Sequence, residues 1–262
     1  MQISFYKYQG TGNDFIIIDN RDNFNGHLTT EEIRNLCDRR FGIGADGLML
    51  LSEKDGFDYE MKYYNADGKE GSMCGNGGRC MAKFAYAQGI KKAAYHFMAF
   101  DGEHEAEIDL NGWVRLKMND VNKVKEQHSE YILNTGSPHI VKFVTDLRDL
   151  DVQEEGHEIR HRKEFAEKGI NVNFVETIDD HTIFVRTYER GVEAETLSCG
   201  TGVTASALMA AHNDVGFNQV DVETLGGKLS VEYERVDEEH FTNIWLCGPA
   251  DFVYKGEIEL KD

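Results

Sequence analysis

Two cysteines stand in nearly the same short sequence, each at the start of a run of small residues. Cys74-Gly-Asn-Gly and Cys199-Gly-Thr-Gly lie 125 residues apart, and each leads into a stretch with helical spacing of apolar residues. A cysteine at a helix N-terminus lies at the positive end of the helix dipole, which lowers its pKa from about 8.5 and makes it a usable base. The glycines leave backbone N–H groups uncovered at the same end, where they can bind a carboxylate or phosphate. Two such thiols on opposite sides of one carbon can remove a proton from one face and deliver one to the other.

The similarity between the two halves of the chain extends beyond the cysteines. Thr11-Gly-Asn-Asp-Phe-Ile-Ile matches Thr135-Gly-Ser-Pro-His-Ile-Val at a distance of 124 residues, and Ala85 matches Ala210 at 125. A nearly constant offset predicts an internal duplication. The chain of 262 residues is long enough for two domains, each with its own core.

The elements that must position the two thiols follow from hydrophobic periodicity. Helices are predicted from Gly75 to Gly89 and from Gly200 to about Gly216; the second is apolar nearly all round and must be buried. Strands are predicted at 15–18, 57–63, 220–224, 229–233 and 241–246, and a capping box at 29–32 opens a further helix. We therefore predict an α+β fold of two pseudo-symmetric domains, each a mixed, mainly antiparallel sheet wrapped around a central helix. The expected domains are 1–122 and 123–262, with the last strand free to return to the first, and the boundary falls in the polar stretch 119–130.

Composition excludes several classes of function. The apolar fraction of 40% and charged fraction of 29% are those of a globular protein, and the net charge of −19 opposes binding to nucleic acid. The sequence contains no apolar run long enough to cross a membrane and no secretory signal at its start, so we expect a cytoplasmic protein with no membrane partner. Its five cysteines include no C-x-x-C pair, which predicts free thiols.

Seven motifs along nearly the whole chain resemble those of the diaminopimelate epimerase family. They are Gly12-Asn-Asp-Phe, Gly42-Ile-Gly-Ala-Asp-Gly, Tyr64-Asn-Ala-Asp-Gly, Met73-Cys-Gly-Asn-Gly-Gly-Arg-Cys, Asn171-Val-Asn-Phe-Val, Tyr188-Glu-Arg-Gly and Glu195-Thr-Leu-Ser-Cys-Gly-Thr-Gly. The resemblance implies interconversion of LL- and meso-diaminopimelate, in lysine and peptidoglycan precursor biosynthesis, by two cysteines that act in turn as acid and base. It implies no cofactor. It also implies a small-molecule substrate, and a homodimer is compatible with the sequence.

The resemblance also assigns roles to individual residues. It implies that Cys74 and Cys199 are the acid and base. It implies that His139 and Glu189 lie beside the thiols and support them. The residues implied to bind the substrate's amino groups and distal carboxylate are Asn13, Asn65, Asn171, Glu189 and Arg190. Those implied to bind the reacting carboxylate are Gly75, Asn76, Gly200 and Thr201. The chain departs from the family at two positions: Gly47 stands where many members have Gln, and Ser137 where they have Asn. Four acidic residues near these motifs are interpreted as structural, Asp46 and Asp67 in turns and Glu70 and Glu195 as supports of the thiol loops.

Three alternative interpretations remain open at this point. His157-Glu-Ile-Arg-His matches the H-E-x-x-H zinc motif, but three basic residues crowd it, so we predict a solvated helix start and no metal site. A proline-racemase-like enzyme of similar fold is the second, although Asn76 stands where that family has His. The third is a thiol redox sensor, in which Cys74 and Cys199 form a reversible disulfide.

Overall fold

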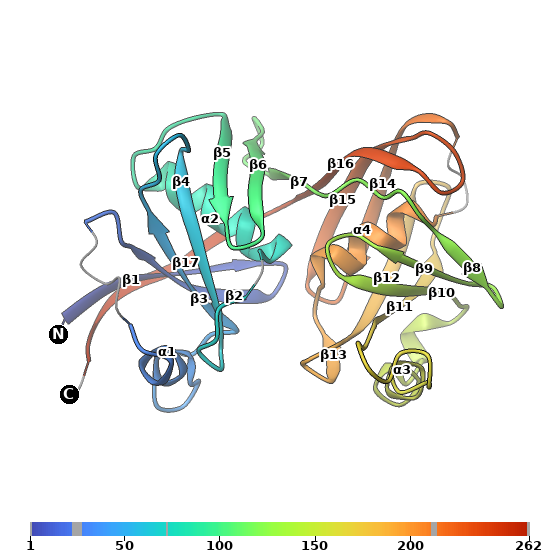
Figure 1. Cartoon of the computed structure of the whole chain (residues 1–262), viewed down its shortest axis with the longest axis horizontal. Coiled ribbons are helices and arrows are strands. Elements are labelled where there is room, and N and C mark those ends of the chain that lie inside the picture. The colour runs from blue at the N-terminus through green and yellow to red at the C-terminus, as the bar shows by residue number, and fades with distance from the viewer. Residues whose placement is uncertain (1, 23–27, 72, 211–213, 261–262) are drawn as a thin grey trace. The chain divides into compact units, whose positions relative to one another are not determined.

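The computed structural model describes residues 2–22, 28–71, 73–210 and 214–260. The chain divides into two units, which are described separately (Figure 1). The first unit consists of Met1–Leu116 together with Gly248–Asp262, and the second of Lys117–Cys247. Residue 122, at which the sequence predicts the division, lies within the second unit.

The first unit is built on a mixed sheet. Its strands are β1 (Gln2–Gly10), β2 (Asn13–Asp19), β3 (Gly47–Ser52), β4 (Tyr59–Asn65), β5 (Ala94–Ala99), β6 (Gly102–Ile108), β7 (Val114–Lys117) and β17 (Asp251–Glu259). They lie in the order β17-β1-β2-β3-β4-β5-β6-β7. Only the β2–β3 and β4–β5 pairs are parallel, because a helix connects the two strands in each of them.

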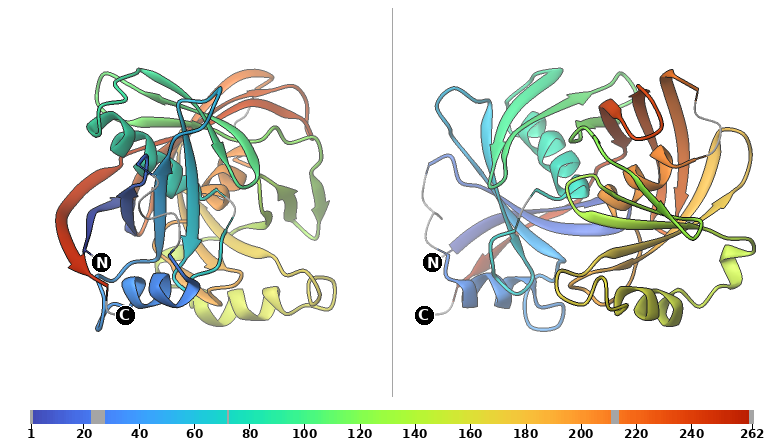
Figure 2. Two further views of the ribbon diagram at one scale, coloured as in Figure 1. Left: turned by 60° about the vertical axis from the view of Figure 1, so that its left-hand side comes forward. Right: turned by 45° about the vertical axis from the view of Figure 1, so that its right-hand side comes forward.

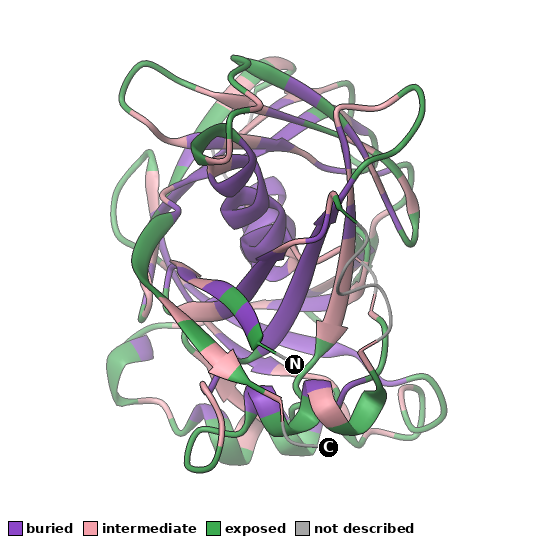
Figure 3. Cartoon of the chain, turned by 90° about the vertical axis from the view of Figure 1, so that its left-hand side faces the viewer, coloured by how far each residue is buried: buried purple, intermediate pink, exposed green. Residues whose placement is uncertain are grey.

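Helix α2 (Gly75–Ala87) is the central helix of the first unit. It contacts β1, β2, β3, β4, β6 and β17, and Figure 3 shows it buried among the strands. Its apolar residues and small N-terminal residues are buried alike, so strands pack on it from several sides. Helix α1 (Thr30–Cys37) lies outside this core and buries one face, with the predicted capping box at Thr29 and Glu32 present.

The second unit repeats this arrangement. Its strands are β8 (Lys125–Gln127), β9 (Glu130–Asn134), β10 (Pro138–Phe143), β11 (Asn171–Thr177), β12 (Thr182–Glu189), β13 (Ala194–Thr196), β14 (Gly216–Thr224), β15 (Gly227–Arg235) and β16 (Phe241–Gly248). The order β9-β10-β11-β12-β14-β15-β16 has the same sequence of antiparallel and parallel pairs as β1 to β7. Strand β8 adds to β9 as β17 adds to β1, and β13 pairs with β12. The matched order confirms the predicted fold class and duplication.

Helix α4 (Gly200–Leu208) takes the place of α2 in the second unit and is buried along most of its length. The prediction that this helix continues to about Gly216 is wrong, because α4 ends at Leu208 and Gly216 begins β14. Part of the expected last turn, 211–213, lies outside the described residues. Helix α3 (Val152–Arg160), preceded by the short helix η1 (Leu147–Asp149), covers the outer face of β11 and β12 as its counterpart α1 contacts β3.

The last strand of the first unit is far from the others in sequence. Strand β17 pairs antiparallel with β1 from Gln2 opposite Glu259 to Gln9 opposite Asp251. The two strands lie side by side, blue and red, in the left view of Figure 2. No helix among the described residues is long and apolar enough to span a lipid bilayer.

Candidate active site

Cys74 is the N-cap residue of α2. Its backbone is extended (φ −93°, ψ 129°), and its carbonyl accepts the first helical bond, from the Gly78 N–H at 2.7 Å. The first N–H groups of a helix have no partner within the helix, and here the residues that carry them, Gly75 and Asn76, are buried. The Cys74 side chain is half-buried, so the thiol lies where the N–H groups and the positive end of the helix dipole act on it.

Asn13 and Asn76 lie next to this thiol. The Asn13 side-chain oxygen Oδ1 is 3.6 Å from Cys74 Sγ and accepts a hydrogen bond from Asn76 Nδ2 at 3.3 Å. Asn13 Nδ2 donates to the Asp46 carboxylate at 2.7 Å. The sequence suggested only a turn role for Asp46. The structure gives it a second role, because its carboxylate orients the Asn13 amide, which contacts the candidate catalytic sulfur.

A buried arginine holds Asn76 from the other side. Arg79 is fully buried and donates to Asn76 Oδ1 at 3.1 Å, to the Gly75 carbonyl at 3.3 Å and to the Pro249 carbonyl at 3.4 Å. The sequence analysis missed this residue. Its position three residues after Asn76, on the same helix face, was the available signal.

Two further positions of the first unit are accounted for by the backbone. Asn65 is exposed at the end of β4, and its carbonyl accepts the Gly68 N–H of a turn at 2.9 Å. At Gly47 a Cβ atom would lie 2.5 Å from Tyr63 Cε2 and 2.7 Å from the Tyr64 carbonyl oxygen. The packing of β3 on β4 therefore excludes a side chain at Gly47, one of the two positions at which a departure from the family is expected from the sequence.

Cys199 is the N-cap residue of α4, as Cys74 is of α2. Its backbone is extended (φ −113°, ψ 112°), and its carbonyl accepts from the Val203 N–H at 2.8 Å. Cys199 is buried, with 9% of its surface exposed. The segment before it is held by Glu195, which accepts two hydrogen bonds from Arg186 at 2.6 and 2.8 Å. The ion pair gives Glu195 a supporting contact at the start of the thiol loop.

His139 connects to Cys199 through the hydroxyl of Thr201. His139 Nε2 is 2.9 Å from Thr201 Oγ1, which in turn is 3.5 Å from Cys199 Sγ. On the other side of the ring, Asn173 Nδ2 lies 3.0 Å from His139 Nδ1. Burial, followed by the positive charge of Arg190, lowers the pKa of His139 to about 3, so the imidazole is neutral at physiological pH.

A second group of polar residues gathers where β10, β11 and β12 meet. Asn171 Nδ2 donates to Ser137 Oγ at 3.0 Å, and Asn171 Oδ1 accepts from the Arg190 backbone N–H at 2.8 Å. The Arg190 guanidinium donates to the Lys168 carbonyl at 2.9 Å and reaches Ser137 Oγ at 3.4 Å. Ser137 thus serves as the acceptor that fixes two of the predicted substrate residues. Glu189 is half-buried at the end of β12, directly before Arg190.

Sequence reasoning did not single out Asn173 or Thr187. Asn173 is fully buried, and its Oδ1 accepts from Thr187 Oγ1 at 3.0 Å. The signal was the alternation of Asn171 and Asn173 in one strand, which places both side chains on the same face of the sheet.

The zinc motif lies at the end of a helix. The prediction of a helix start is wrong, because His157 belongs to the last turn of α3 and His161 is its C-cap. The two rings are 4.1 Å apart, and His161 Nδ1 lies 2.8 Å from the His157 carbonyl. Among the described residues, no group of three or more His, Cys, Asp or Glu side chains is placed to hold a metal ion.

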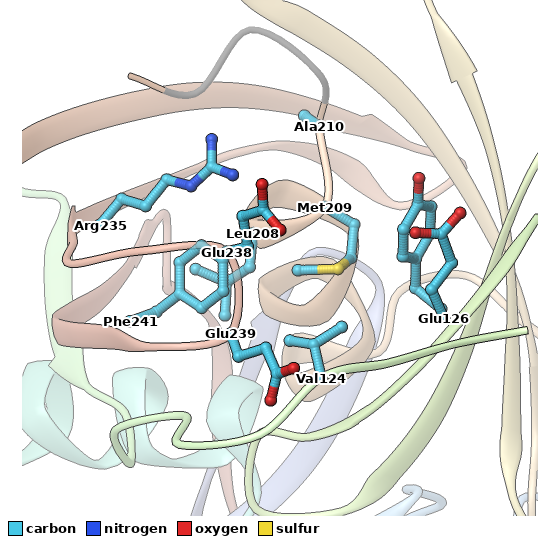
Figure 4. Close-up of a pocket in the computed structure, with 10 residues that line it drawn as sticks. Val124, Glu126, Leu208, Met209, Ala210, Arg235, Glu238, Glu239 and Phe241 are labelled. Carbon is cyan, nitrogen blue, oxygen red and sulfur yellow. The ribbon is translucent and has the colours of Figure 1, made fainter. Parts of the chain in front are cut away.

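A cavity of about 410 Å³ lies at the opposite end of α4 from Cys199 (Figure 4). Its walls include Leu208, the last residue of α4, the C-cap Met209, and Phe241 from β16. Because α4 has nine residues and rises by about 1.5 Å per residue, this cavity is distant from the thiol and belongs to a different part of the unit.

Comparison with known proteins identifies the family. The family model for diaminopimelate epimerase matches residues 5–124 and 131–253. The chain is 48% identical over 257 residues to a diaminopimelate epimerase of Flavobacterium psychrophilum, covering 98% of this chain and 100% of that one. It is 44% identical over 261 residues to the Chlorobaculum tepidum diaminopimelate epimerase, covering 96% and 99%.

Solved structures of low sequence identity share the fold alone. A Bacillus anthracis phenazine biosynthesis protein of the PhzF family superposes with a TM-score of 0.75 at 18% identity, covering 99% of this chain and 100% of that one. An Agrobacterium vitis hydroxyproline epimerase gives a TM-score of 0.70 at 13% identity, covering 100% and 93%. With the matched thiol helices and the family motifs along nearly its whole length, the chain belongs to the diaminopimelate epimerase family.

Proposed function

We propose that this chain catalyses the epimerisation of LL-diaminopimelate to meso-diaminopimelate by two cysteines, without a cofactor. The observation that carries the proposal is the matched pair of free thiols, each the N-cap of a buried helix that begins with glycine. Family membership supports the choice of substrate, because the relatives above are diaminopimelate epimerases at up to 48% identity over nearly the full chain. The step belongs to lysine and peptidoglycan precursor synthesis, which suits a cytoplasmic enzyme.

In this mechanism one thiolate removes the α-proton and the other thiol delivers a proton to the opposite face. The C–H bond breaks as an S–H bond forms on the first sulfur, and the second sulfur gives up its proton as the new C–H bond forms. The α-carboxylate gains negative charge when the first proton leaves. The N–H groups at the starts of α2 and α4, from Gly75, Asn76, Gly200 and Thr201, would stabilise that charge.

The remaining predicted residues suit the rest of a zwitterionic substrate. Arg190 carries the positive charge needed for the distal carboxylate, and its orientation is supported by Ser137 and the Lys168 carbonyl. Asn13, Asn65 and Asn171 offer amide donors and acceptors, and Glu189 a carboxylate, for the amino groups. Ser137 stands where the resemblance leads us to expect Asn. Its hydroxyl accepts hydrogen bonds from Asn171 and Arg190, so its role in this proposal is to position these two side chains.

The test is α-proton exchange in heavy water with LL-diaminopimelate, followed by NMR and chiral analysis. We expect deuterium incorporation and the meso isomer with the wild type. Net epimerisation should fall at least 100-fold in Cys74→Ala and in Cys199→Ala, about the contribution of one acid–base group. Cys37→Ala is the matched control, because Cys37 is a buried residue of α1, and it should retain activity.

Each contrary outcome points to a different conclusion. Exchange with proline and not with diaminopimelate would reject the substrate but keep the two-thiol chemistry. If either Cys→Ala variant epimerised at the wild-type rate, the two-base mechanism would be rejected.

A further inference from the structure

The groups beside the two candidate catalytic sulfurs differ in the hydrogen bonds that they can make. At Cys74 the neighbouring atom is an amide oxygen, Asn13 Oδ1, at 3.6 Å. At Cys199 it is a hydroxyl oxygen, Thr201 Oγ1, at 3.5 Å. An amide oxygen only accepts hydrogen bonds, whereas a hydroxyl can donate one. Which group donates at each sulfur decides which protonation state of that sulfur is stabilised.

The orientation of the Asn13 amide is fixed at one end by a carboxylate and at the other by a second amide. Its Nδ2 faces the Asp46 carboxylate at 2.7 Å, which requires the NH₂ group on that side. Its Oδ1 faces Asn76 Nδ2 at 3.3 Å, and Asn76 is itself oriented because its Oδ1 accepts from the Arg79 guanidinium at 3.1 Å. Asn13 therefore presents an acceptor to Cys74, and the contact is satisfied when Cys74 is a protonated thiol that donates.

In the second unit the amide of Asn173 fixes the tautomer of His139. Asn173 Nδ2 donates to the Ile140 carbonyl at 3.1 Å, which identifies this atom as the nitrogen, and Asn173 Oδ1 accepts from Thr187 at 3.0 Å. The second hydrogen of the same NH₂ group faces His139 Nδ1 at 3.0 Å. His139 Nδ1 is therefore the acceptor, and the proton of the neutral ring is on Nε2.

The proton on Nε2 determines what Thr201 can do. His139 Nε2–H donates to Thr201 Oγ1 at 2.9 Å. The hydroxyl, having accepted this bond, directs its own hydrogen to Cys199 Sγ at 3.5 Å. A donor facing the sulfur stabilises the thiolate, so Cys199 is favoured in its ionised form.

At the corresponding described positions of the first unit, the side chains cannot form such a relay. The residues 124 before His139 and Asn173 are Phe15 and Met49, which are both apolar and fully buried. The helix glycines show the same difference: a Cβ at Gly202 would lie 2.2 Å from Asn173 Oδ1, whereas one at Gly77 would lie 3.1 Å from Met49 Sδ. At these matched described positions, the duplicated framework thus carries the polar side chains of the relay in the second unit and apolar side chains in the first.

Nearby charges and dipoles also act on the sulfur and the imidazole within each unit. The helix dipole acts on both sulfurs, because each cysteine is an N-cap, and so does not distinguish them. Burial lowers the pKa of His139, and the positive charge of Arg190, directly after β12, lowers it further, so His139 is neutral. Beside Cys74, Asp46 is paired with Arg39 at 2.8 Å, and the charge of Arg79 is directed to Asn76 and backbone carbonyls.

We propose that the enzyme without substrate holds Cys199 as the thiolate and Cys74 as the thiol, and that Asn173 is the positioning residue that sets this difference. The proposal rests on the proposed function for its catalytic meaning. In the resting enzyme Cys199 takes the α-proton and Cys74 delivers its own, after which the two sulfurs hold the opposite protonation states. Proton exchange with solvent then restores the starting form.

The test is the pH dependence of alkylation of the free protein by iodoacetamide, with each cysteine quantified by mass spectrometry. The thiolate is the reactive form, so the pH midpoint reports ionisation and the plateau rate reports access. We expect the midpoint for Cys199 to lie below that for Cys74. Asn173→Asp places a carboxylate against His139 Nδ1, moves the ring proton to that atom and leaves Nε2 as an acceptor for the Thr201 hydroxyl.

In Asn173→Asp the midpoint for Cys199 should therefore rise by about one pH unit, which is a loss of about tenfold in alkylation rate below the midpoint. The midpoint for Cys74 should not move. Asn122→Asp, at an exposed position of the same unit, is the matched control and should leave both midpoints unchanged. Thr201→Val, which removes the donor hydroxyl alone, should shift Cys199 in the same direction and tests the relay if Asn173→Asp does not fold.

Equal midpoints in the wild type, or a lower one at Cys74, would overturn the proposal, and so would an unshifted Cys199 in both variants. These outcomes are independent of substrate. A protein with the expected midpoints that fails to epimerise diaminopimelate would reject the proposed function and leave the assignment of the thiolate standing.

Discussion

Replacing Gly202 by alanine should destabilise the second unit, whereas the equivalent change at Gly77 should not destabilise the first. Both glycines are the third residue of their helix, and both follow a candidate catalytic cysteine by three positions. The added methyl at Gly202 meets the buried Asn173 oxygen at 2.2 Å. At Gly77 the nearest atom is the sulfur of Met49 at 3.1 Å, at the flexible end of a side chain.

The magnitude follows from three contributions. Overpacking costs about 1–3 kcal/mol, and displacing the hydrogen-bonded Asn173 amide costs about 1–3 kcal/mol more. Alanine in a helix recovers about 1 kcal/mol relative to glycine. Gly202→Ala should therefore lose about 1–5 kcal/mol in the free energy of unfolding, with a central value of about 3 kcal/mol, and Gly77→Ala should stay within about 1 kcal/mol of the wild type.

The assay is thermal unfolding followed by circular dichroism, with both variants measured beside the wild type. For a unit of this size 1 kcal/mol corresponds to about 4 °C, so a loss of about 3 kcal/mol should lower the transition of Gly202→Ala by about 12 °C. Equal transitions for the two variants would refute the reasoning, since they would show that the close contact between Gly202 and Asn173 does not limit packing.

Three further predictions concern stability. Arg186→Leu should lower the free energy of unfolding by about 3 kcal/mol, because it leaves the partly buried Glu195 without its bidentate partner. Lys228→Ala removes an exposed ion pair and should lower it by less than about 0.5 kcal/mol. Urea unfolding of both variants tests this difference. Thr29→Ala removes the capping box of α1 and should lower stability by about 1 kcal/mol in the same assay; no change would show that the cap contributes nothing. The pKa of His139, lowered to about 3, means that the unfolded chain binds a proton between pH 6.5 and 3 that the folded chain does not, so stability falls as the pH drops through that range. Chemical unfolding at several pH values should show a steeper fall for the wild type than for His139→Gln, by up to about 1.4 kcal/mol per pH unit, and parallel curves would contradict the shift.

Sequence patterns were sufficient for the features that depend on local periodicity or on the duplication. The repeated Cys-Gly-x-Gly placed both cysteines at helix N-caps, and alternation located strands such as β4 and β15. The end of α4 was not predictable in this way, because its continuing run of alanines favours helix and only the tertiary structure turns the chain toward β14 at Gly216.

The supporting residues of the site were harder to predict than the thiols. Arg79 orients Asn76, and Asn173 orients His139. Such contacts depend on which strands and helices become neighbours in the fold. The reason for glycine at position 47 was equally hidden, since it lies in the side chain of Tyr63 on the adjacent strand. Polar residues that are fully buried carry no surface or spacing signal strong enough to reveal these partners.

The pairing of β1 with β17 also makes the completion of the first unit depend on a strand that is synthesised after the whole of the second unit. The second unit is a single continuous segment, Lys117–Cys247, and all its strands have been made before β17 is translated. The first unit lacks its last strand until then, and β1 has an unpaired edge in the meantime. The second unit can therefore form its complete set of strand pairs without β17, whereas the first unit cannot. A released chain truncated before residue 251 would contain every strand of the second unit but would leave the edge of β1 unpaired, which makes it a candidate for aggregation or chaperone binding.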